Sequence, residues 1–358
     1  MKPVKDPKTG KWMIQYRYED WTGQKHKTTK RGFNTKHEAD EWWRDFQVQQ
    51  KRSLDIKFSD FVEIYLEDKS HRLKAYTMHN KTYIINSKLI PYFGTKKMNE
   101  ITVAEIRKWQ NELISQGYTP TYLKTINNNL NAIFNYAVDY YELSSNPCRK
   151  AGSMGKNKAD EMNIWTLDEY RQFIDCCMDD RVVWLACQIL FWTGVRIGEL
   201  LALTFADVDL KNNMMTISKS LQRLHGKDLI TPPKTPKSNR KIKIPKFLVQ
   251  DIQDYWESLY EPQQEDRIIP IKKCAVQRGI NQGIKCSGVK KIRIHDFRHS
   301  HASLLMNMGT PIKEISERLG HENIETTLNT YAHLYPDDQD KLAQKLDQRY
   351  LQEMNDIE

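Results

Sequence analysis

The stretch 294–335, near the end of this 358-residue chain, constrains its fold and chemistry more than any other segment. His295 and Arg298 lie three residues apart at the start of a predicted helix, and glycines then divide the stretch into short helical segments. His321 follows the second of these glycines, and Tyr331 comes ten residues later. Basic residues followed by one tyrosine near the end of a helix indicate phosphate chemistry with a tyrosine nucleophile.

The composition favours a polyanionic partner. The net charge is +9 and the isoelectric point is about 9.0, while hydrophobic residues, at 39%, still allow sizeable cores. Residues 1–36 hold ten Lys or Arg against three Asp or Glu, which accounts for +7 of the total. A solvated, solubilising face is the alternative explanation for this charge. The length allows two or three domains, and the first is predicted to be a small basic module.

Cysteine spacing and hydropathy bear on the cellular compartment. The six cysteines form no C-x-x-C pair and no His/Cys cluster with zinc spacing, so we expect no metal site. The chain starts without an apolar leader and contains no long apolar run. We therefore expect a cytoplasmic protein with reduced thiols and no membrane partner.

Residues 1–53 are predicted to form a three-stranded sheet backed by one helix. Apolar residues alternate over 11–18, and 25–31 is predicted to be the returning strand. Thr35 and Glu38 form a capping box that opens a helix through about residue 51. One basic face of this sheet is the candidate DNA-binding surface. Its residues are Arg17, Lys25, Lys27, Lys30 and Arg31.

Residues 58–147 predict a four-helix domain. The expected N-caps are Ser59, Thr77, Thr102 and Thr119, the third within a capping box and the fourth followed by proline at the first helical position. The flanking segments 52–57 and 149–160 are predicted to be linkers.

Residues 160–358 predict a mixed α/β domain. Arg196 and Glu199 lie at i and i+3 in an apolar setting, so the carboxylate can hold the guanidinium in one orientation. Strands are expected at 214–218 and 240–244, with a lysine-bearing turn before the second, and a helix should follow from Pro245. The whole chain is therefore expected to be multidomain, mainly α with small β-sheets.

These motifs, in this order, resemble the tyrosine recombinases. The resemblance rests on the segments Thr193–Leu200, His295–His299, Leu319–His321, Thr326–Thr327 and Tyr331–His333. The three-module layout is similar to that of phage-type integrases and integrases of conjugative elements. The resemblance covers essentially the whole chain and is weakest over residues 1–53.

The resemblance implies a role for each site residue. Tyr331 would attack a DNA phosphodiester to give a 3′-phosphotyrosine and a free 5′-hydroxyl. Arg196 and Arg298 would contact the non-bridging oxygens, and His295 and His321 would act as acid/base groups or phosphate hydrogen-bond donors. A hairpin lysine would protonate the departing 5′ oxygen, and Lys234 matches that position better than its competitor Lys237. No metal or other cofactor is implied.

Other candidates in the same region are less favoured. Tyr335 lies four residues beyond Tyr331 but lacks the family context, and His299, His301 and His333 are expected to be structural or surface residues. The segment 337–354 is predicted to be an amphipathic helix, which either tethers a neighbouring protomer or packs on its own domain.

The resulting interpretation is a site-specific integrase that integrates and excises a mobile element. Residues 58–147 and 160–358 would enclose core-type sites on double-stranded DNA, and residues 1–53 would bind arm-type sites. A homotetramer is expected on DNA, with a directionality factor and a host DNA-bending protein as further partners. The alternatives are a type IB topoisomerase-like enzyme, a chromosome-dimer-resolving recombinase and a non-catalytic DNA-binding protein.

Overall fold

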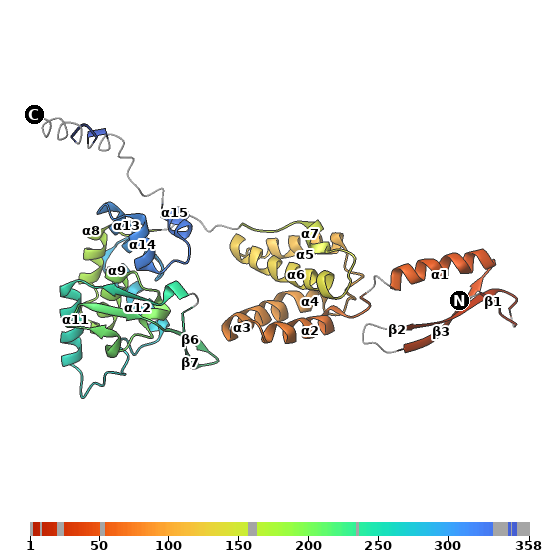
Figure 1. The fold of residues 1–358 in the computed structure, drawn as a ribbon, viewed down its shortest axis with the longest axis horizontal. Coiled ribbons are helices and arrows are strands. Elements are labelled where there is room, and N and C mark those ends of the chain that lie inside the picture. The colour runs from red at the N-terminus through yellow and green to blue at the C-terminus, as the bar shows by residue number, and fades with distance from the viewer. Residues whose placement is uncertain are drawn as a thin grey trace, which may run out of the picture. The chain divides into compact units, whose positions relative to one another are not determined.

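The computed structural model describes residues 3–7, 9–19, 25–50, 54–156, 163–233, 236–331, 343–344 and 346–348. The chain divides into two compact units, residues 1–160 and 161–358 (Figure 1). The described elements are mainly helical, with small antiparallel sheets in each unit. This confirms the fold class predicted from the sequence.

The first unit begins with a three-stranded antiparallel sheet in the order β1-β2-β3, formed by Val4–Lys5, Trp12–Glu19 and Lys25–Phe33. Helix α1, Lys36–Gln50, follows it, and the Thr35 hydroxyl accepts a 3.1 Å hydrogen bond from the Glu38 amide as the capping box predicted. Ile14 and Ala39 are fully buried between sheet and helix. Alternate residues of β2 therefore face α1, because side chains alternate between the two faces of a strand.

The strand register decides which cations share a face. Arg17 pairs with Lys27, and the exposed Arg31 pairs with Met13 on the same, outer face. Lys30 instead pairs with Ile14, so it belongs to the face covered by α1, although its side chain is exposed. The prediction that all five cations line one face is wrong for Lys30, because strand periodicity separates it from Arg31.

The rest of the first unit is a helical bundle around a second hydrophobic core. Its helices are α2 (Phe58–Ser70), α3 (Ala75–Ile84), α4 (Ile90–Phe93), α5 (Val103–Ser115), α6 (Pro120–Tyr140) and α7 (Pro147–Ala151). A π-helical turn at Ile85–Leu89 joins α3 to α4, so both belong to the second of the four predicted helices. The first two helices start earlier than expected, with Lys57 and Lys74 at their N-caps, whereas the Thr102 capping box is present as predicted.

The two predicted linkers are partly wrong. Leu54 and Ile56 are buried in the helical core, and the Ile56 carbonyl accepts a hydrogen bond from the Met98 amide. At the other end α7 and buried Met154 pack on the same core. Each segment is polar overall, which is why it was predicted to be a linker, but a few of its apolar residues are buried in the helical core.

The second unit carries the other hydrophobic cores. Its helices are α8 (Leu167–Asp175), α9 (Arg181–Thr193), α10 (Ile197–Leu200), α11 (Lys246–Glu257), α12 (Lys273–Ser287), α13 (Asp296–Asn307), α14 (Ile312–Leu319) and α15 (Ile324–Tyr331). One sheet has the order β4-β5-β8, from Val208–Asp209, Met214–Ile217 and Arg240–Lys243, and β6 (Ser220–Leu224) forms a hairpin with β7 (Lys227–Thr231). The sequence predicted β5 and β8 but neither this hairpin nor α12.

Helix α12 is hard to recognise from sequence because it contains two glycines, which are poor helix formers. Both glycines lie against α8 and α9. A methyl group on Gly279 would come within 2.5 Å of Val183, and one on Gly283 would come within 2.7 Å of the Cys177 sulfur. The glycines therefore let α12 approach its neighbours closely, which is a tertiary reason for a locally unfavourable choice.

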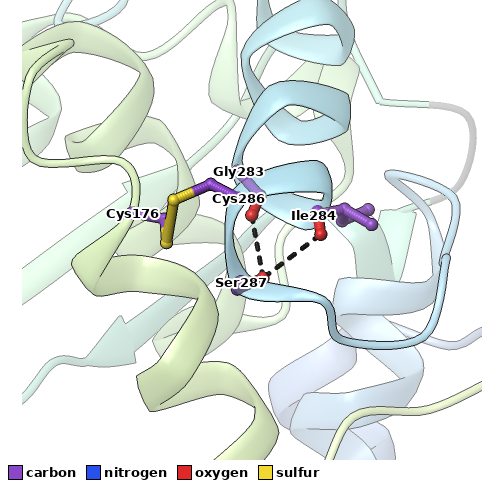
Figure 2. The surroundings of a disulfide bond; sticks show 5 residues. All are labelled: Cys176, Gly283, Ile284, Cys286 and Ser287. Carbon is purple, nitrogen blue, oxygen red and sulfur yellow. Dashed lines mark hydrogen bonds between the residues drawn. A yellow bond between two sulfur atoms is a disulfide. The ribbon is translucent and has the colours of Figure 1, made fainter.

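Cys176, at the end of α8, and Cys286, in α12, form a disulfide with a Cα–Cα distance of 6.0 Å (Figure 2). The expectation that all thiols are reduced is wrong for this pair, because the packing of α12 on α8 brings residues 110 positions apart within bonding range. Within the described residues, no helix is long and apolar enough to cross a membrane.

Candidate active site

Arg298 is fixed inside the second unit at the start of α13. Its side chain is buried, and its two terminal nitrogens donate to the Gly194 carbonyl at 2.7 Å and the Leu319 carbonyl at 2.5 Å. Burial and the nearby charge of Arg196 lower the pKa of Arg298 to about 9, so the guanidinium stays positively charged near neutral pH. The ends of α9 and α14 are thus held together by a buried cation.

Glu199 holds two arginines at once. The Nη1 atom of Arg196, at the N-cap of α10, donates to Glu199 Oε1 at 2.9 Å, as the i, i+3 spacing predicted. From the other side, the Nη2 atom of Arg240 in β8 donates to Glu199 Oε2 at 3.0 Å. The side chains of Glu199 and Arg240 are only 4% and 6% exposed, whereas that of Arg196 is 37% exposed. Glu199 and Arg240 form a buried brace that orients Arg196, whose side chain remains accessible.

Arg240 also connects this brace to the end of α14. Its Nε donates to the Arg318 carbonyl at 2.8 Å, and its Nη1 donates to the Ser238 carbonyl at 3.0 Å. Gly320, which ends α14 with a φ of +68°, leaves room for this guanidinium, since a methyl group there would lie 3.0 Å from the Cδ and Nη1 atoms of Arg240. The glycine before His321 is therefore required by backbone conformation and by space.

His321 is held by a buried threonine. Its Nδ1 lies 2.7 Å from the hydroxyl of Thr327, which is fully buried in α15. Burial and the charges of Arg298 and Arg196 lower the pKa of His321 to about 3, so the ring is neutral near pH 7. This contact fixes the ring by one nitrogen and leaves Nε2 for another partner.

Tyr331, the last residue of α15, is 1% exposed. Its hydroxyl oxygen lies 2.6 Å from Nδ1 of His299 in α13. Burial raises the pKa of Tyr331 to about 12, while the positive charges of Arg298 and Arg196 oppose that rise. The sequence predicted a structural or surface role for His299, and its burial agrees with a structural one, but the sequence did not predict that His299 contacts Tyr331. Its position directly after Arg298 and four residues after His295 was the only signal available in the sequence.

The remaining predicted site residues are placed less completely. His295 is exposed at the N-cap of α13, with its ring centroid 4.9 Å from that of His299. Lys234 lies outside the described residues. The amine of Lys237 donates to the Glu322 carbonyl at 2.8 Å, and Lys237 and His321 line the same cavity of about 770 Å³. The predicted C-terminal helix falls largely outside the described residues.

Several lysines of the helical bundle are engaged within it. Lys81 is partly buried and donates to the Tyr65 hydroxyl at 2.9 Å and to Asn129 at 3.0 Å. Lys96 pairs with Glu105, the acidic residue of the α5 capping box. These contacts stabilise the bundle and reduce the number of its cations that are free for an external partner.

Comparison with known proteins places this geometry in a family. The Phage integrase family matches residues 164–337, the Phage integrase N-terminal SAM-like domain matches 57–114, and the Arm DNA-binding domain matches 3–50. The ICEBs1 integrase of Bacillus subtilis (strain 168) is 33% identical over 319 residues, covering 85% of this chain and 86% of its own. The tyrosine recombinase XerC-like protein of Caldanaerobacter subterraneus is 25% identical, with 88% and 90% covered.

Solved structures agree with this fold. The Tn1549 transposon integrase in complex with circular intermediate DNA matches with a TM-score of 0.64 and 22% identity, over 80% of this chain and 99% of that one. A lambda integrase dimer bound to a core site matches with a TM-score of 0.62 and 18% identity, over 94% and 95%.

A buried tyrosine beside two oriented arginines, on this fold, defines a tyrosine recombinase. The chain belongs to the phage integrase family of tyrosine recombinases and is a site-specific recombinase of the integrase type. The function and enzyme class predicted from the sequence are thereby confirmed.

Proposed function

We propose that this integrase cuts and rejoins double-stranded DNA through Tyr331. The hydroxyl oxygen would attack a phosphodiester, forming a 3′-phosphotyrosine and releasing a 5′-hydroxyl. Because the covalent linkage keeps the energy of the broken bond, a 5′-hydroxyl from another strand can reverse the step without ATP or metal. The observation that carries the proposal is the burial of Tyr331 within the field of Arg196 and Arg298.

The two arginines would stabilise the pentacoordinate phosphorane. Arg298 is held by two backbone carbonyls and Arg196 by the brace, so neither must be reorganised when negative charge develops. Removing one such donor costs roughly 3–4 kcal/mol of transition-state stabilisation in other enzymes. His321, anchored through Nδ1, would offer Nε2–H to a phosphate oxygen, and the exposed His295 would provide a second imidazole.

Lys234 would protonate the departing 5′ oxygen, with Lys237 as the competitor. The two candidates can be separated by comparing Lys234→Ala and Lys237→Ala on a normal substrate and on one with a sulfur leaving group, which needs no proton. The variant that lacks the general acid should be slow on the normal substrate and close to wild type on the substrate with the sulfur leaving group. If both variants are equally slow on both substrates, neither lysine is the acid.

We further propose three functional domains and a tetrameric assembly. Residues 1–53 would bind arm-type sites through Arg17, Lys25, Lys27 and Arg31, while residues 58–147 and 160–358 bind core-type sites. Lambda integrase provides the precedent, having been solved as a dimer on a core site and as a tetramer on a Holliday junction. A directionality factor and a host DNA-bending protein would be further partners. Binding should weaken steeply with salt, because phosphate contacts dominate.

A nicked suicide substrate tests the chemistry. After cleavage, the short DNA fragment that bears the new 5′-hydroxyl diffuses away. An active protein therefore accumulates as a denaturation-resistant covalent complex, and its attachment site can be mapped. Wild type and the control variant Tyr335→Phe should form the complex through residue 331. Tyr331→Phe should bind the same DNA but form none. A covalent complex in Tyr331→Phe would overturn the nucleophile assignment.

A further inference from the structure

The contact between His299 and Tyr331 gives the nucleophile a partner that the two arginines do not supply. The Nδ1–Oη distance of 2.6 Å is short for a hydrogen bond, and both side chains are buried. The ring centroids are 5.4 Å apart and the rings are tilted by 56°, so the contact is made edge-on through the polar atoms. Arg196 and Arg298 can stabilise an oxyanion but cannot accept a proton.

The surroundings of His299 keep its imidazole neutral before DNA binds. Burial, followed by the neighbouring His295, lowers the pKa of His299 to about 4. Asp296 opposes this effect, while Arg298 and Arg293 add to it. A neutral imidazole has one ring nitrogen with a free lone pair, and a tyrosine hydroxyl can donate to it. In the tautomer that carries its proton on Nε2, Nδ1 of His299 accepts the hydrogen bond from the Tyr331 hydroxyl at neutral pH.

We propose that His299 is a further catalytic residue, the base that accepts the Tyr331 hydroxyl proton during strand cleavage. This inference rests on the proposed nucleophilic role of Tyr331. As Tyr331 Oη bonds to the scissile phosphorus, its proton moves to Nδ1 of His299, and the bond from phosphorus to the 5′ oxygen breaks. The 5′ oxygen takes a proton from the hairpin lysine. In the reverse step, His299 returns the proton to Tyr331 as the 5′-hydroxyl attacks.

The positions of the charges make the transfer sensitive to DNA. In the free protein, the difference between the two pKa values disfavours moving the proton, so the resting tyrosine stays protonated. A bound phosphate brings negative charge next to Arg298, one of the cations that lower the pKa of His299, and it therefore raises that pKa. The acidity of the tyrosine hydroxyl rises as its oxygen bonds to phosphorus. Proton transfer is thus coupled to attack rather than preceding it.

Two reactions of the full-length chain separate this role from a structural one. The first is cleavage of the suicide substrate, which needs deprotonation of Tyr331. The second is ligation of a strand bearing a 3′-p-nitrophenyl phosphate, in which a 5′-hydroxyl attacks the same phosphorus and displaces p-nitrophenolate without using Tyr331. Both reactions need the fold, DNA binding and the arginines, but only the first needs a base for the tyrosine.

His299→Asn is the main variant, because its amide can occupy the place of Nδ1 and hydrogen bond to Tyr331 without taking a proton. Cleavage should fall by about 10²-fold or more, the usual contribution of a general base, while ligation of the p-nitrophenyl substrate stays within a few-fold of wild type. Added imidazole should partly restore cleavage to His299→Gly. The cleavage rate of the wild type should fall at acidic pH as the His299 side chain becomes protonated, whereas that of His299→Asn should not show this fall.

The buried His301 provides a matched control on the same helix. It accepts a hydrogen bond from Arg318 at 3.1 Å, so His301→Gln should affect both reactions together, if either. Equal losses in both reactions for His299→Asn would assign His299 to the fold instead, and unchanged cleavage would remove it from the mechanism. Failure of wild type to form any covalent complex would instead reject the proposed function. A Tyr331→Phe protein that ligates without cleaving keeps the two questions separate.

Discussion

The buried brace makes a quantitative prediction for Arg240→Met. The methionine keeps much of the volume but removes the charge and four hydrogen bonds: two to Glu199, one to the Arg318 carbonyl and one to the Ser238 carbonyl. Glu199 keeps only Arg196 among its two ion-pair partners. Breaking a buried pair from one side typically costs about 3–5 kcal/mol, which for a unit of this size lowers the melting temperature by roughly 6–20 °C.

The dependence on pH identifies the cause of this loss. In the wild type, burial raises the pKa of Glu199, but the charges of Arg240 and Arg196 outweigh burial and lower this pKa overall. The ion pairs of Glu199 therefore stabilise the fold fully above the ordinary carboxyl pKa. This stabilisation is lost as the pH falls through the lowered pKa. Without Arg240, burial dominates and the pKa of Glu199 rises. Protonation of Glu199 then removes the buried unpaired charge of the variant at mildly acidic pH. The difference in melting temperature between the variant and the wild type should therefore narrow as pH falls from 7 towards 5.

Calorimetry of the full-length chain at several pH values measures both effects. The double variant Arg240→Met/Glu199→Gln is the control, because it removes the carboxylate left without its buried partner. It should recover part of the lost melting temperature at pH 7. A loss under 1 kcal/mol, a gap independent of pH, or no recovery in the double variant would each refute the brace. Strand cleavage should also fall, since Arg196 would lose its fixed orientation.

Three further outcomes are expected. Gly320→Ala should destabilise the protein by more than the roughly 1 kcal/mol that replacing a positive-φ glycine typically costs, because the added methyl group meets Arg240. Gly309→Ala is the control: its φ is similar but its surroundings are open, so it should cost only the roughly 1 kcal/mol of backbone strain. Equal melting temperatures for the two variants would contradict the close approach of the Arg240 guanidinium to Gly320. Cys176→Ser should lower stability by up to about 4–5 kcal/mol under oxidising conditions, because the bond to Cys286 closes a long loop, and an undiminished difference in excess dithiothreitol would contradict this. Cleavage should continue in EDTA, since the arginines supply the positive charge; loss of activity restored by a divalent cation would point to other chemistry.

The sequence alone determined the local elements and the order of the site residues. The capping box at Thr102 and the left-handed glycine Gly320 involve contacts within a few positions, so they could be recognised without knowing the fold. The pairing of Arg196 with Glu199 was predictable for the same reason. The resemblance to the integrases then assigned the separated motifs to one site.

Only the tertiary structure decided which distant residues meet. Arg240 and Glu199 are 41 positions apart, and His299 and Tyr331 are 32 apart. Neither pair follows from a local pattern, because helix and strand packing sets such contacts, and a buried polar group must find its partner wherever packing places one. Tyr331 could therefore be proposed as the nucleophile from the sequence, whereas its contact with His299 became visible only once α13 and α15 were packed together.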